Sequence, residues 1–178
     1  MKSVNECFDT VKKDYFKFLN KEKIFSQSKE SKIKNLKKFY IPISFWIEKK
    51  YKKKGKTLFI GISGGQGSGK TTITKILKII LKNFFRRETL VFSIDDFYKT
   101  LKDRHKMSSK IHPLFKTRGV PGTHDIKLLR KIFQKLLKKN FSSFLIPKFD
   151  KSIDDRCKSK QWYSVKKKPD VIIFEGWC

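Results

Sequence analysis

The sequence has 178 residues, enough for one domain with a sizeable core and a helical extension. Its 38% hydrophobic and 14% aromatic content favours a folded chain over a disordered one. A formal charge of +28 would ordinarily suggest nucleic acid or an anionic membrane, but only six of the 44 basic residues are Arg and the Lys are spread along the chain. We therefore expect no nucleic-acid partner, and no apolar stretch is long enough to span a bilayer.

The N-terminal residues and the cysteines point to a cytoplasmic protein. The first sixteen residues contain no apolar signal region and no small-residue cleavage site. The three cysteines, Cys7, Cys157 and Cys178, are odd in number and widely scattered. This spacing is typical of neither a metal site nor a disulfide framework, so we expect reduced thiols.

The first segment, 1–55, predicts a helical extension that ends in a basic linker. Apolar residues recur at steps of three and four from Val4 to Leu19, which places them on one helical face. A second helical pattern begins at Ile33, and Pro42 is expected to interrupt it. The run Lys49–Lys56 is expected to be an exposed linker. No chemistry is visible here, and we expect these helices to pack on the main domain, 56–178.

From Thr57 onward, apolar runs alternate with amphipathic helices. Buried strands are predicted at Leu58–Ser63, Thr89–Ile94 and Val171–Glu175. Helices are predicted from Lys70 to about Phe84 and from Ile126 to about Asn140, and Thr123 or Asp125 can cap the second. That helix has an expected apolar face of Ile126, Leu129, Phe133, Leu136 and Leu137. The alternation predicts an α/β fold, a parallel sheet wrapped by helices, with a polar, loop-like segment at 95–122 and a short strand or extended loop near residue 146.

The strongest motif is GGQGSGKT, at Gly64–Thr71, which matches G-x-x-x-x-G-K-[ST] at every position. Its glycines let the backbone curl so that N–H groups point at phosphate oxygens, beside the positive end of the following helix. The Lys70 ammonium can reach the β- and γ-phosphates of ATP, and the Thr71 hydroxyl can ligate Mg²⁺. The residues expected to hold the nucleotide are Gly64, Gly65, Gln66, Gly67, Ser68, Gly69, Lys70, Thr71 and Thr72.

Carboxylates follow two of the predicted strands. Asp95 and Asp96 come at the end of the Thr89–Ile94 strand, and Glu175 ends the third strand. Neighbouring strand residues point opposite ways, so we expect one of the two aspartates to face the phosphates. Phosphoryl transfer needs a carboxylate to orient the acceptor hydroxyl, and Mg²⁺ needs hard oxygen ligands. Thr71, Asp95 and Glu175 supply that set, although a strand-end carboxylate can also simply cap backbone.

Several motifs in order resemble the glycerate kinase family, a branch of P-loop kinases related to uridine, pantothenate and phosphoribulose kinases. They are IGISGGQGSGKTT, FSIDDFYKT, IHPLFKTRGVPGTHD, PKFDKSIDDR and DVIIFEGWC, and they cover about Leu58 to Cys178. The resemblance implies transfer of the ATP γ-phosphate to D-glycerate. It assigns catalytic roles to Lys70, to Asp95 as general base and to Glu175 on the metal side. It also places the Glu175 strand between the other two strands.

The resemblance further implies an acceptor pocket lined by Arg118, Thr123, His124, Asp125, Lys148, Asp150 and Arg156. An anionic acceptor such as glycerate needs a cationic partner, and the planar forks of Arg118 and Arg156 match a carboxylate. A surface salt bridge is the other interpretation of each arginine. His124 and Asp125 could equally be structural at the start of a helix, and His112 is expected to be structural.

Three other interpretations stay open. The acceptor could be another hydroxylated metabolite, such as pantothenate or a nucleoside. The chain could also be a basic nucleic-acid-binding protein, or an inactive remnant. Relatives continue well beyond the position of Cys178, so we expect a longer protein, and we expect these 178 residues alone to bind nucleotide weakly and turn over poorly.

Overall fold

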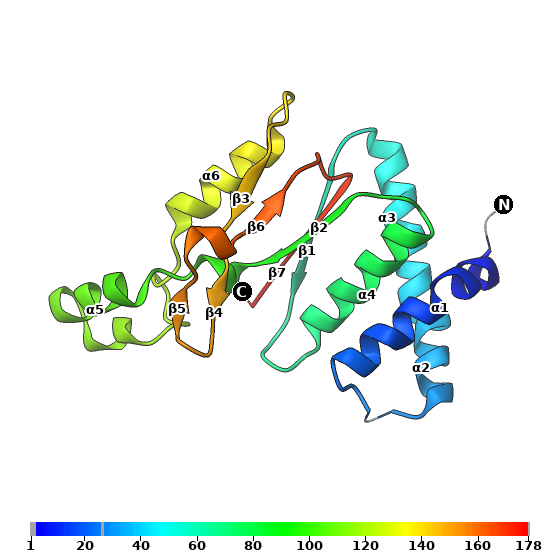
Figure 1. Cartoon of the computed structure of the whole chain (residues 1–178), viewed down its shortest axis with the longest axis horizontal. Helices are drawn as coiled ribbons and strands as arrows, with labels where there is room; N and C mark the ends of the chain where they lie inside the picture. The colour runs from blue at the N-terminus through cyan, green and yellow to red at the C-terminus, as the bar shows by residue number, and fades with distance from the viewer. Residues whose placement is uncertain (1–2, 26, 178) are drawn as a thin grey trace. The chain divides into compact units, whose positions relative to one another are not determined.

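The computed structural model describes residues 3–25 and 27–177, which divide into two compact units (Figure 1). The first unit takes in the described residues of Met1–Val91 and Pro169–Cys178, and the second unit is Phe92–Lys168. These units do not coincide with the segments 1–55 and 56–178 predicted from the sequence. The physical reason is that the N-terminal helices share one apolar core with the strands that follow them.

The first unit combines helices with a three-stranded sheet. Its helices are α1 (Val4–Lys21), α2 (Lys29–Asn35), the π-helical η1 (Leu36–Tyr40), α3 (Ile41–Lys54) and α4 (Lys70–Asn83). The sheet has the order β1 (Leu58–Ser63), β7 (Val171–Gly176), β2 (Thr89–Ser93), so the Glu175 strand lies in the middle, as expected. β1 and β7 pair in parallel, from Leu58 opposite Val171 to Ser63 opposite Gly176. The predicted α/β fold is confirmed.

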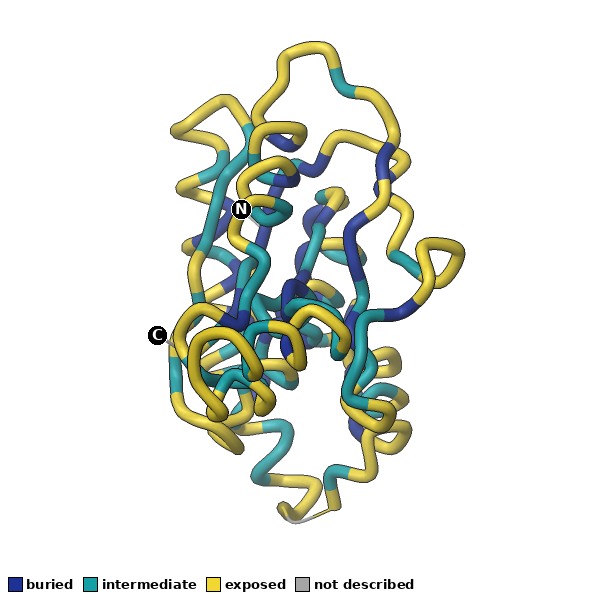
Figure 2. The backbone as a smooth tube through the Cα atoms, turned by 90° about the vertical axis from the view of Figure 1, so that its left-hand side faces the viewer, coloured by how far each residue is buried: buried dark blue, intermediate teal, exposed yellow. Residues whose placement is uncertain are grey.

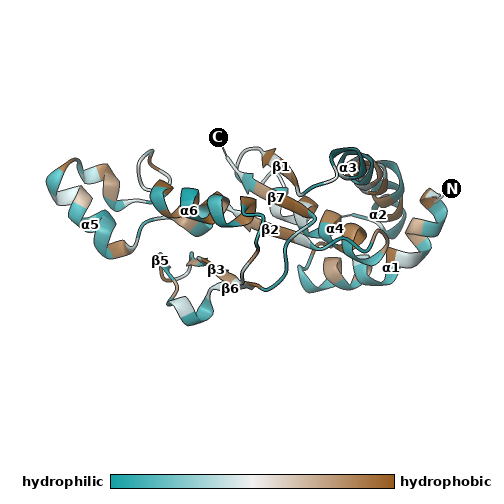
Figure 3. Cartoon of the chain, turned by 90° about the horizontal axis from the view of Figure 1, so that it is seen from above, coloured by the Kyte–Doolittle hydropathy of each residue, from teal (hydrophilic) through white to brown (hydrophobic). Residues whose placement is uncertain are grey.

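A single core joins the N-terminal helices to α4 and β7. Its buried members come from α1, the η1–α3 segment, α4 and β7, and they include Cys7, Val11, Tyr15, Leu19, Leu36, Ile41, Ile47, Ile76, Leu77, Ile80, Leu81, Val171 and Ile173. The helices α1, α3 and α4 lie side by side in Figure 1, and buried stretches of the backbone are dark blue in Figure 2. The middle strand β7 carries the hydrophobic colour in Figure 3. The helical extension is therefore part of the unit that carries the phosphate loop.

The prediction that Pro42 interrupts the second helix is wrong. Pro42 lies in the first turn of α3, where a missing N–H costs no hydrogen bond within that helix, and the wider π-helical turn of η1 precedes it. The prediction of a linker at Lys49–Lys56 is also wrong, because α3 continues to Lys54 and ends at Gly55. Lysine is a good helix former whose ammonium can extend into water, so a run of lysines prolongs the helix.

A buried ion pair ties α3 to the chain just before β2. Glu48 is 6% exposed, and its carboxylate accepts hydrogen bonds from Arg87, Nε to Oε2 at 2.8 Å and Nη2 to Oε1 at 2.5 Å. Burial alone would raise the pKa of Glu48, but the hydrogen bonds and charge of Arg87 outweigh it, so that this pKa lies below its ordinary value of 4.5. The pair therefore stabilises the fold above pH 4.5, and the stabilisation is lost as the pH falls through the lowered pKa.

We expect Glu48→Gln to destabilise the chain by about 2 kcal/mol at neutral pH and to flatten the acid side of its stability profile. Urea unfolding at a series of pH values, followed by circular dichroism, measures both effects. The control is Lys52→Ala, since Lys52 lies 3.6 Å from Glu48 but is 69% exposed. We expect it to change stability by less than about 0.5 kcal/mol. An unchanged acid profile in Glu48→Gln would contradict this role for the pair.

The second unit has short elements linked by turns. It contains η2 (Ile94–Phe97), α5 (Leu101–Lys110), η3 (Pro113–Lys116), α6 (Ile126–Leu137), β3 (Phe144–Ile146), β4 (Phe149–Asp150), β5 (Asp155–Arg156), η4 (Ser159–Gln161) and β6 (Tyr163–Val165). Two antiparallel pairs form, β3 with β6 and β4 with β5. Asp125 caps α6 by accepting from Leu128 N at 3.0 Å, one of the two predicted caps.

The predicted apolar face of α6 is correct for only some of its residues. Leu136 is buried, whereas Ile126 and Leu137 are 50% and 66% exposed. Both lie at the ends of the helix, and α6 stops at Leu137 instead of continuing to Asn140. The buried residues Ile132 and Leu136 lie four positions apart on one face, whereas Leu137 is turned by about 100° from Leu136 around the helix axis, so the periodic pattern overstates the buried face.

The described residues include two of the three cysteines and the helices named above. Within the described residues, Cys7 and Cys157 are buried and neither forms a disulfide, and Cys178 lies outside the described residues. In residues 3–25 and 27–177, no helix combines the length and the apolar character that crossing a bilayer requires.

Candidate active site

The segment Gly64–Thr71 forms a tight loop between β1 and α4. Gly67 and Gly69 take left-handed backbone conformations, with φ of 71° and 81°, which residues with a side chain rarely adopt. The N–H of Ser68 points back to Gly65 O at 3.4 Å, and α4 begins at Lys70. The loop therefore curls at a helix N-terminus, where the first backbone N–H groups have no partner inside the helix and attract anions.

The Lys70 side chain folds back over this loop. Its Nζ donates hydrogen bonds to Gly64 O and to Gly65 O, both at 2.6 Å. These bonds hold the ammonium group against the loop that would receive the phosphates. A phosphate oxygen carries more negative charge than a carbonyl oxygen, so it would compete well for the same ammonium.

Thr71 and Glu175 bring two hard oxygens together at the start of α4 and the end of β7. Thr71 Oγ1 donates to Glu175 Oε1 at 2.8 Å, and Glu175 is 6% exposed. A buried carboxylate is costly unless it is paired, and Mg²⁺ prefers such oxygens, so this donor set fits the ion. Within the part of the chain that the structure describes, no group of three His, Cys, Asp or Glu side chains gathers to hold a metal. Phosphate oxygens and water would have to complete the coordination.

Asp95 and Asp96 lie in the second unit, on the turn η2 that follows β2. Their different surroundings come from this turn, not from strand alternation. The Asp96 carboxylate accepts from Ser93 N at 3.2 Å and from Phe149 N at 3.3 Å, so it holds main chain in place. Asp95 instead forms an ion pair with Lys151 Nζ at 2.7 Å and is 26% exposed. Asp95 is the carboxylate of the two that is placed to meet a ligand.

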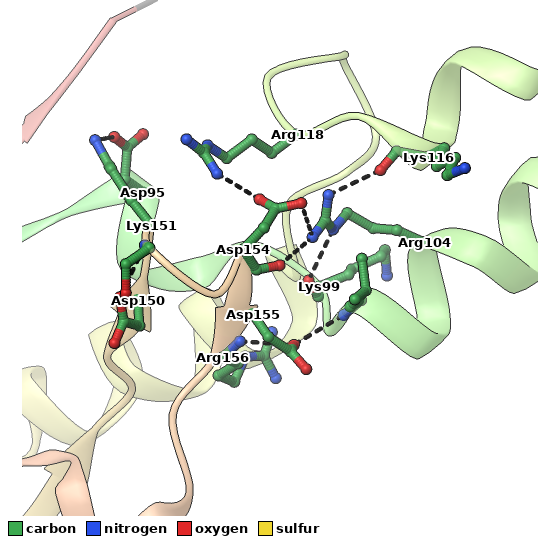
Figure 4. Close-up of polar contacts among 12 residues, drawn as sticks. Asp95, Lys99, Arg104, Lys116, Arg118, Asp150, Lys151, Asp154, Asp155 and Arg156 are labelled. Atoms are coloured by element: carbon green, nitrogen blue, oxygen red, sulfur yellow. Dashed lines mark hydrogen bonds and ion pairs between the residues drawn. The ribbon is translucent and has the colours of Figure 1, made fainter.

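The two arginines expected to hold an acceptor carboxylate are bound to carboxylates of the chain itself. Arg118 Nη1 donates to Asp154 Oδ1, and Figure 4 shows these two groups facing each other. Arg156 Nη1 and Nη2 each lie 3.3 Å from Asp125 Oδ2, and its Nη2 also donates to Tyr98 O at 2.6 Å. The Arg156 side chain is only 12% exposed. Each arginine therefore already has an internal partner.

A buried arginine that no sequence pattern marks organises the same region. Arg104 is 0% exposed, and Figure 4 shows Asp154 between Arg104 and Arg118. Arg104 donates to Asp154 Oδ2 at 2.9 Å, to Lys116 O at 2.9 Å and to Lys99 O at 3.3 Å. Burial would raise the pKa of Asp154, but hydrogen bonds from Arg104 and Arg118 outweigh it and lower that pKa. The sequence offers only a weak signal for Arg104: arginine is rare among the basic residues of this chain, so each arginine is a candidate for a specific contact.

We expect Arg104→Met to destabilise the second unit by about 3–5 kcal/mol, because it leaves carbonyls and the Asp154 carboxylate without their buried donor. Hydrogen exchange should show that Arg104→Met accelerates amide exchange, relative to the wild type, more in residues 92–168 than in the first unit. Arg118→Met is the matched control, since it removes one bond from a side chain that is 35% exposed. Equal losses in the two variants would contradict a central role for Arg104.

Four other residues predicted to line the acceptor pocket have structural contacts. The Thr123 hydroxyl donates to Val120 O at 2.6 Å, and Asp125 caps α6. Lys148 Nζ lies 5.9 Å from the centre of the Tyr163 ring. Asp150 Oδ1 accepts from Ser152 N at 2.9 Å and from Ser152 Oγ at 2.6 Å, which fixes the turn after β4.

His124 stands apart from these residues. The His124 ring stacks on Tyr98 with centroids 4.1 Å apart. His112 has a different, structural contact, because its Nδ1 accepts a hydrogen bond from Leu114 N at 3.3 Å. Burial lowers the pKa of His124 from its ordinary 6.5, while the Asp95 carboxylate opposes that shift. The imidazole is therefore neutral at pH 7. Among the hydrogen bonds of the described residues, none engages its buried Nε2.

A parallel sheet with a glycine-rich phosphate loop, a lysine and a serine or threonine at the start of the next helix defines the P-loop class of nucleotide-binding proteins. Residues 59–178 match the Phosphoribulokinase / Uridine kinase family, and the chain belongs to this family. This membership confirms the resemblance to P-loop kinases seen in the sequence and the assignment to a family of kinases.

Individual relatives agree with the family. The chain is 37% identical over 132 residues to the "Probable ATP-dependent kinase TDA10" of Saccharomyces cerevisiae, covering 67% of this chain and 45% of that protein. It is 33% identical over 156 residues to the chloroplastic D-glycerate 3-kinase of Arabidopsis thaliana, covering 78% and 34%. A solved D-glycerate 3-kinase from Cryptococcus neoformans is 32% identical with a TM-score of 0.59, over 68% of this chain and 43% of that one. The chain thus spans about half the length, or less, of these relatives.

Proposed function

We propose that this protein transfers the γ-phosphoryl group of ATP to a hydroxyl group of a small anionic metabolite, with D-glycerate as the favoured acceptor. The observation that carries the proposal is the Thr71–Glu175 contact of 2.8 Å beside the curled phosphate loop. That contact sets a hydroxyl and a carboxylate side by side at the start of α4, where a nucleotide-bound cation would lie. Two D-glycerate 3-kinases among the relatives support the acceptor.

The chain's own residues would divide the work as follows. The loop amides and the Lys70 ammonium bind and orient the phosphates, and Thr71 and Glu175 would hold Mg²⁺. The bound ion supplies positive charge that neutralises the phosphates during transfer. Asp95 accepts the proton of the acceptor hydroxyl. Asp95 needs its ion pair with Lys151 to open for this step.

An acceptor panel tests the proposal. The protein is incubated with ATP and Mg²⁺ together with D-glycerate, pantothenate or uridine, and ADP release is measured. We expect release with D-glycerate above that with either of the others. Preferential turnover of pantothenate or uridine would overturn the acceptor assignment but leave the kinase assignment in place. Tight, salt-sensitive RNA or DNA binding that survives Lys70→Ala, with no turnover of any acceptor, would overturn the kinase assignment.

A further inference from the structure

Of the three arginines of the second unit discussed above and Lys151, all in the described part of the chain, Lys151 is the cation in a position to meet an acceptor carboxylate. Arg104 is fully buried, Arg118 is bound to Asp154, and Arg156 is 12% exposed and bound to Asp125 and Tyr98 O. Lys151 differs from all three arginines, because its side chain is 61% exposed and its ion pair is with Asp95 itself. Figure 4 shows the Lys151 ammonium against the Asp95 carboxylate, whereas the Arg118 guanidinium is directed to Asp154.

The backbone beneath Lys151 is held in place on both sides. β4 and β5 pair antiparallel, with Asp150 opposite Asp155, and Asp150 fixes the first turn residues through Ser152. Asp155 Oδ1 accepts from Leu101 N at 2.8 Å, which ties the returning strand to α5. Lys151 therefore presents a flexible, exposed ammonium from a fixed support, next to the carboxylate proposed to act on the acceptor hydroxyl.

We propose that Lys151 is the specificity-determining residue that binds the carboxylate of the acceptor. The inference rests on the proposed function and narrows it to acceptors that carry a carboxylate close to the reacting hydroxyl. When such an acceptor binds, its carboxylate takes the ammonium of Lys151 in place of Asp95. The Asp95 carboxylate is thereby released to accept a hydrogen bond from the acceptor hydroxyl.

Through this exchange, the negative charge of the acceptor controls whether Asp95 is free to act on the hydroxyl. A neutral acceptor cannot draw Lys151 away, so the Lys151–Asp95 pair of 2.7 Å persists and keeps Asp95 from the hydroxyl. An anionic acceptor replaces one ion pair with another, so no ammonium is left unpaired. A lysine suits the exchange better than an arginine, because its single point charge on a four-carbon stem can swing between two carboxylates.

The test compares D-glycerate with glycerol, which has CH₂OH in place of the carboxylate. Steady-state kinetics with ATP and Mg²⁺ are measured for the wild type, Lys151→Ala, Lys151→Arg and the control Lys160→Ala, an exposed lysine on η4. We expect Lys151→Ala to raise KM for D-glycerate by about 10- to 100-fold. With glycerol, turnover is expected to be low in the wild type and equal or higher in Lys151→Ala, because the variant no longer holds Asp95 in an ion pair. Lys151→Arg should recover part of the loss, and Lys160→Ala should match the wild type.

The possible failures can be told apart. If the wild type phosphorylates D-glycerate and Lys151→Ala keeps its KM, the inference is overturned and the proposed function stands. If Lys151→Ala loses D-glycerate and glycerol turnover equally, Lys151 supports the site without reading the carboxylate, which also overturns the inference. If the wild type neither phosphorylates nor, by calorimetry with a non-hydrolysable ATP analogue, binds any anionic acceptor, proposed function and inference fall together. Melting temperatures of all variants should agree, because Lys151 is exposed.

Discussion

Lys70→Ala is expected to lower ATP-dependent phosphorylation by about 100- to 1,000-fold. Lys70 is the ammonium that the structure holds against the phosphate loop, through 2.6 Å hydrogen bonds to Gly64 O and Gly65 O. Charge builds on the transferred phosphoryl group and its leaving oxygens, and a cation held against the loop stabilises that charge directly. Alanine leaves the loop amides in place but removes this cation.

The measurement is kcat with D-glycerate at saturating ATP, together with the affinity for a fluorescent ATP analogue. The matched control is Lys75→Ala on the same helix, where Lys75 pairs with Glu22 at 2.9 Å and is 42% exposed. We expect this control to keep full activity and to change stability by less than about 1 kcal/mol. A Lys70→Ala protein that folds and retains more than a tenth of wild-type kcat would contradict the role assigned to the loop.

The phosphate site could be predicted because its determinants are local in the sequence. Gly67, Gly69, Lys70 and Thr71 lie within one loop and the helix start that follows it, so their spacing alone dictates the geometry. The Glu175 contact spans 104 residues, yet an apolar strand that ends in a carboxylate marks it. Strand and helix periodicity placed both ends of that contact at the same edge of one sheet.

The ion pairs of the second unit could not be predicted in the same way, because they join charged residues that are far apart in the sequence. Arg104 and Asp154 are 50 residues apart and lie in polar segments with no strong periodicity. The family motif around residue 150 drew attention to Asp150 and Arg156, whereas the ion pair with Asp95 belongs to Lys151. In a chain with 44 basic residues, sequence alone does not distinguish an arginine that holds the fold from a lysine that faces a ligand.

The different contacts of the arginines and of Lys151 have a physical basis in the shapes of the two side chains. Arg104 and Arg156 each make several bonds in fixed directions, as Arg156 does to Asp125 and Tyr98 O, and such forks suit rigid internal positions. The lysine instead holds one exposed ion pair that can exchange. Under the proposed function, a small anionic acceptor is therefore bound by Lys151, which makes the fewest internal contacts, although bidentate geometry favoured the arginines.

Asp95→Asn is expected to reduce kcat for D-glycerate by about 100- to 10,000-fold and to leave nucleotide affinity near that of the wild type. The amide keeps the size of the carboxylate but cannot accept the proton of the acceptor hydroxyl. It also breaks the ion pair with Lys151, so that the ammonium is free before the acceptor arrives. The KM for D-glycerate should therefore stay equal or fall while kcat collapses.

Asp96→Asn separates this chemical role from a structural one. Its carboxylate receives Ser93 N and Phe149 N on different oxygens, and the Asn amide can accept only one of these bonds. We expect Asp96→Asn to lower the melting temperature and to keep kcat within about tenfold of the wild type, since one lost buried hydrogen bond costs about 1–3 kcal/mol of stability. If Asp96→Asn proved inactive and Asp95→Asn active in folded proteins, the general base would have to be reassigned to Asp96. The ion pair between Asp95 and Lys151 would then lose its proposed link to catalysis.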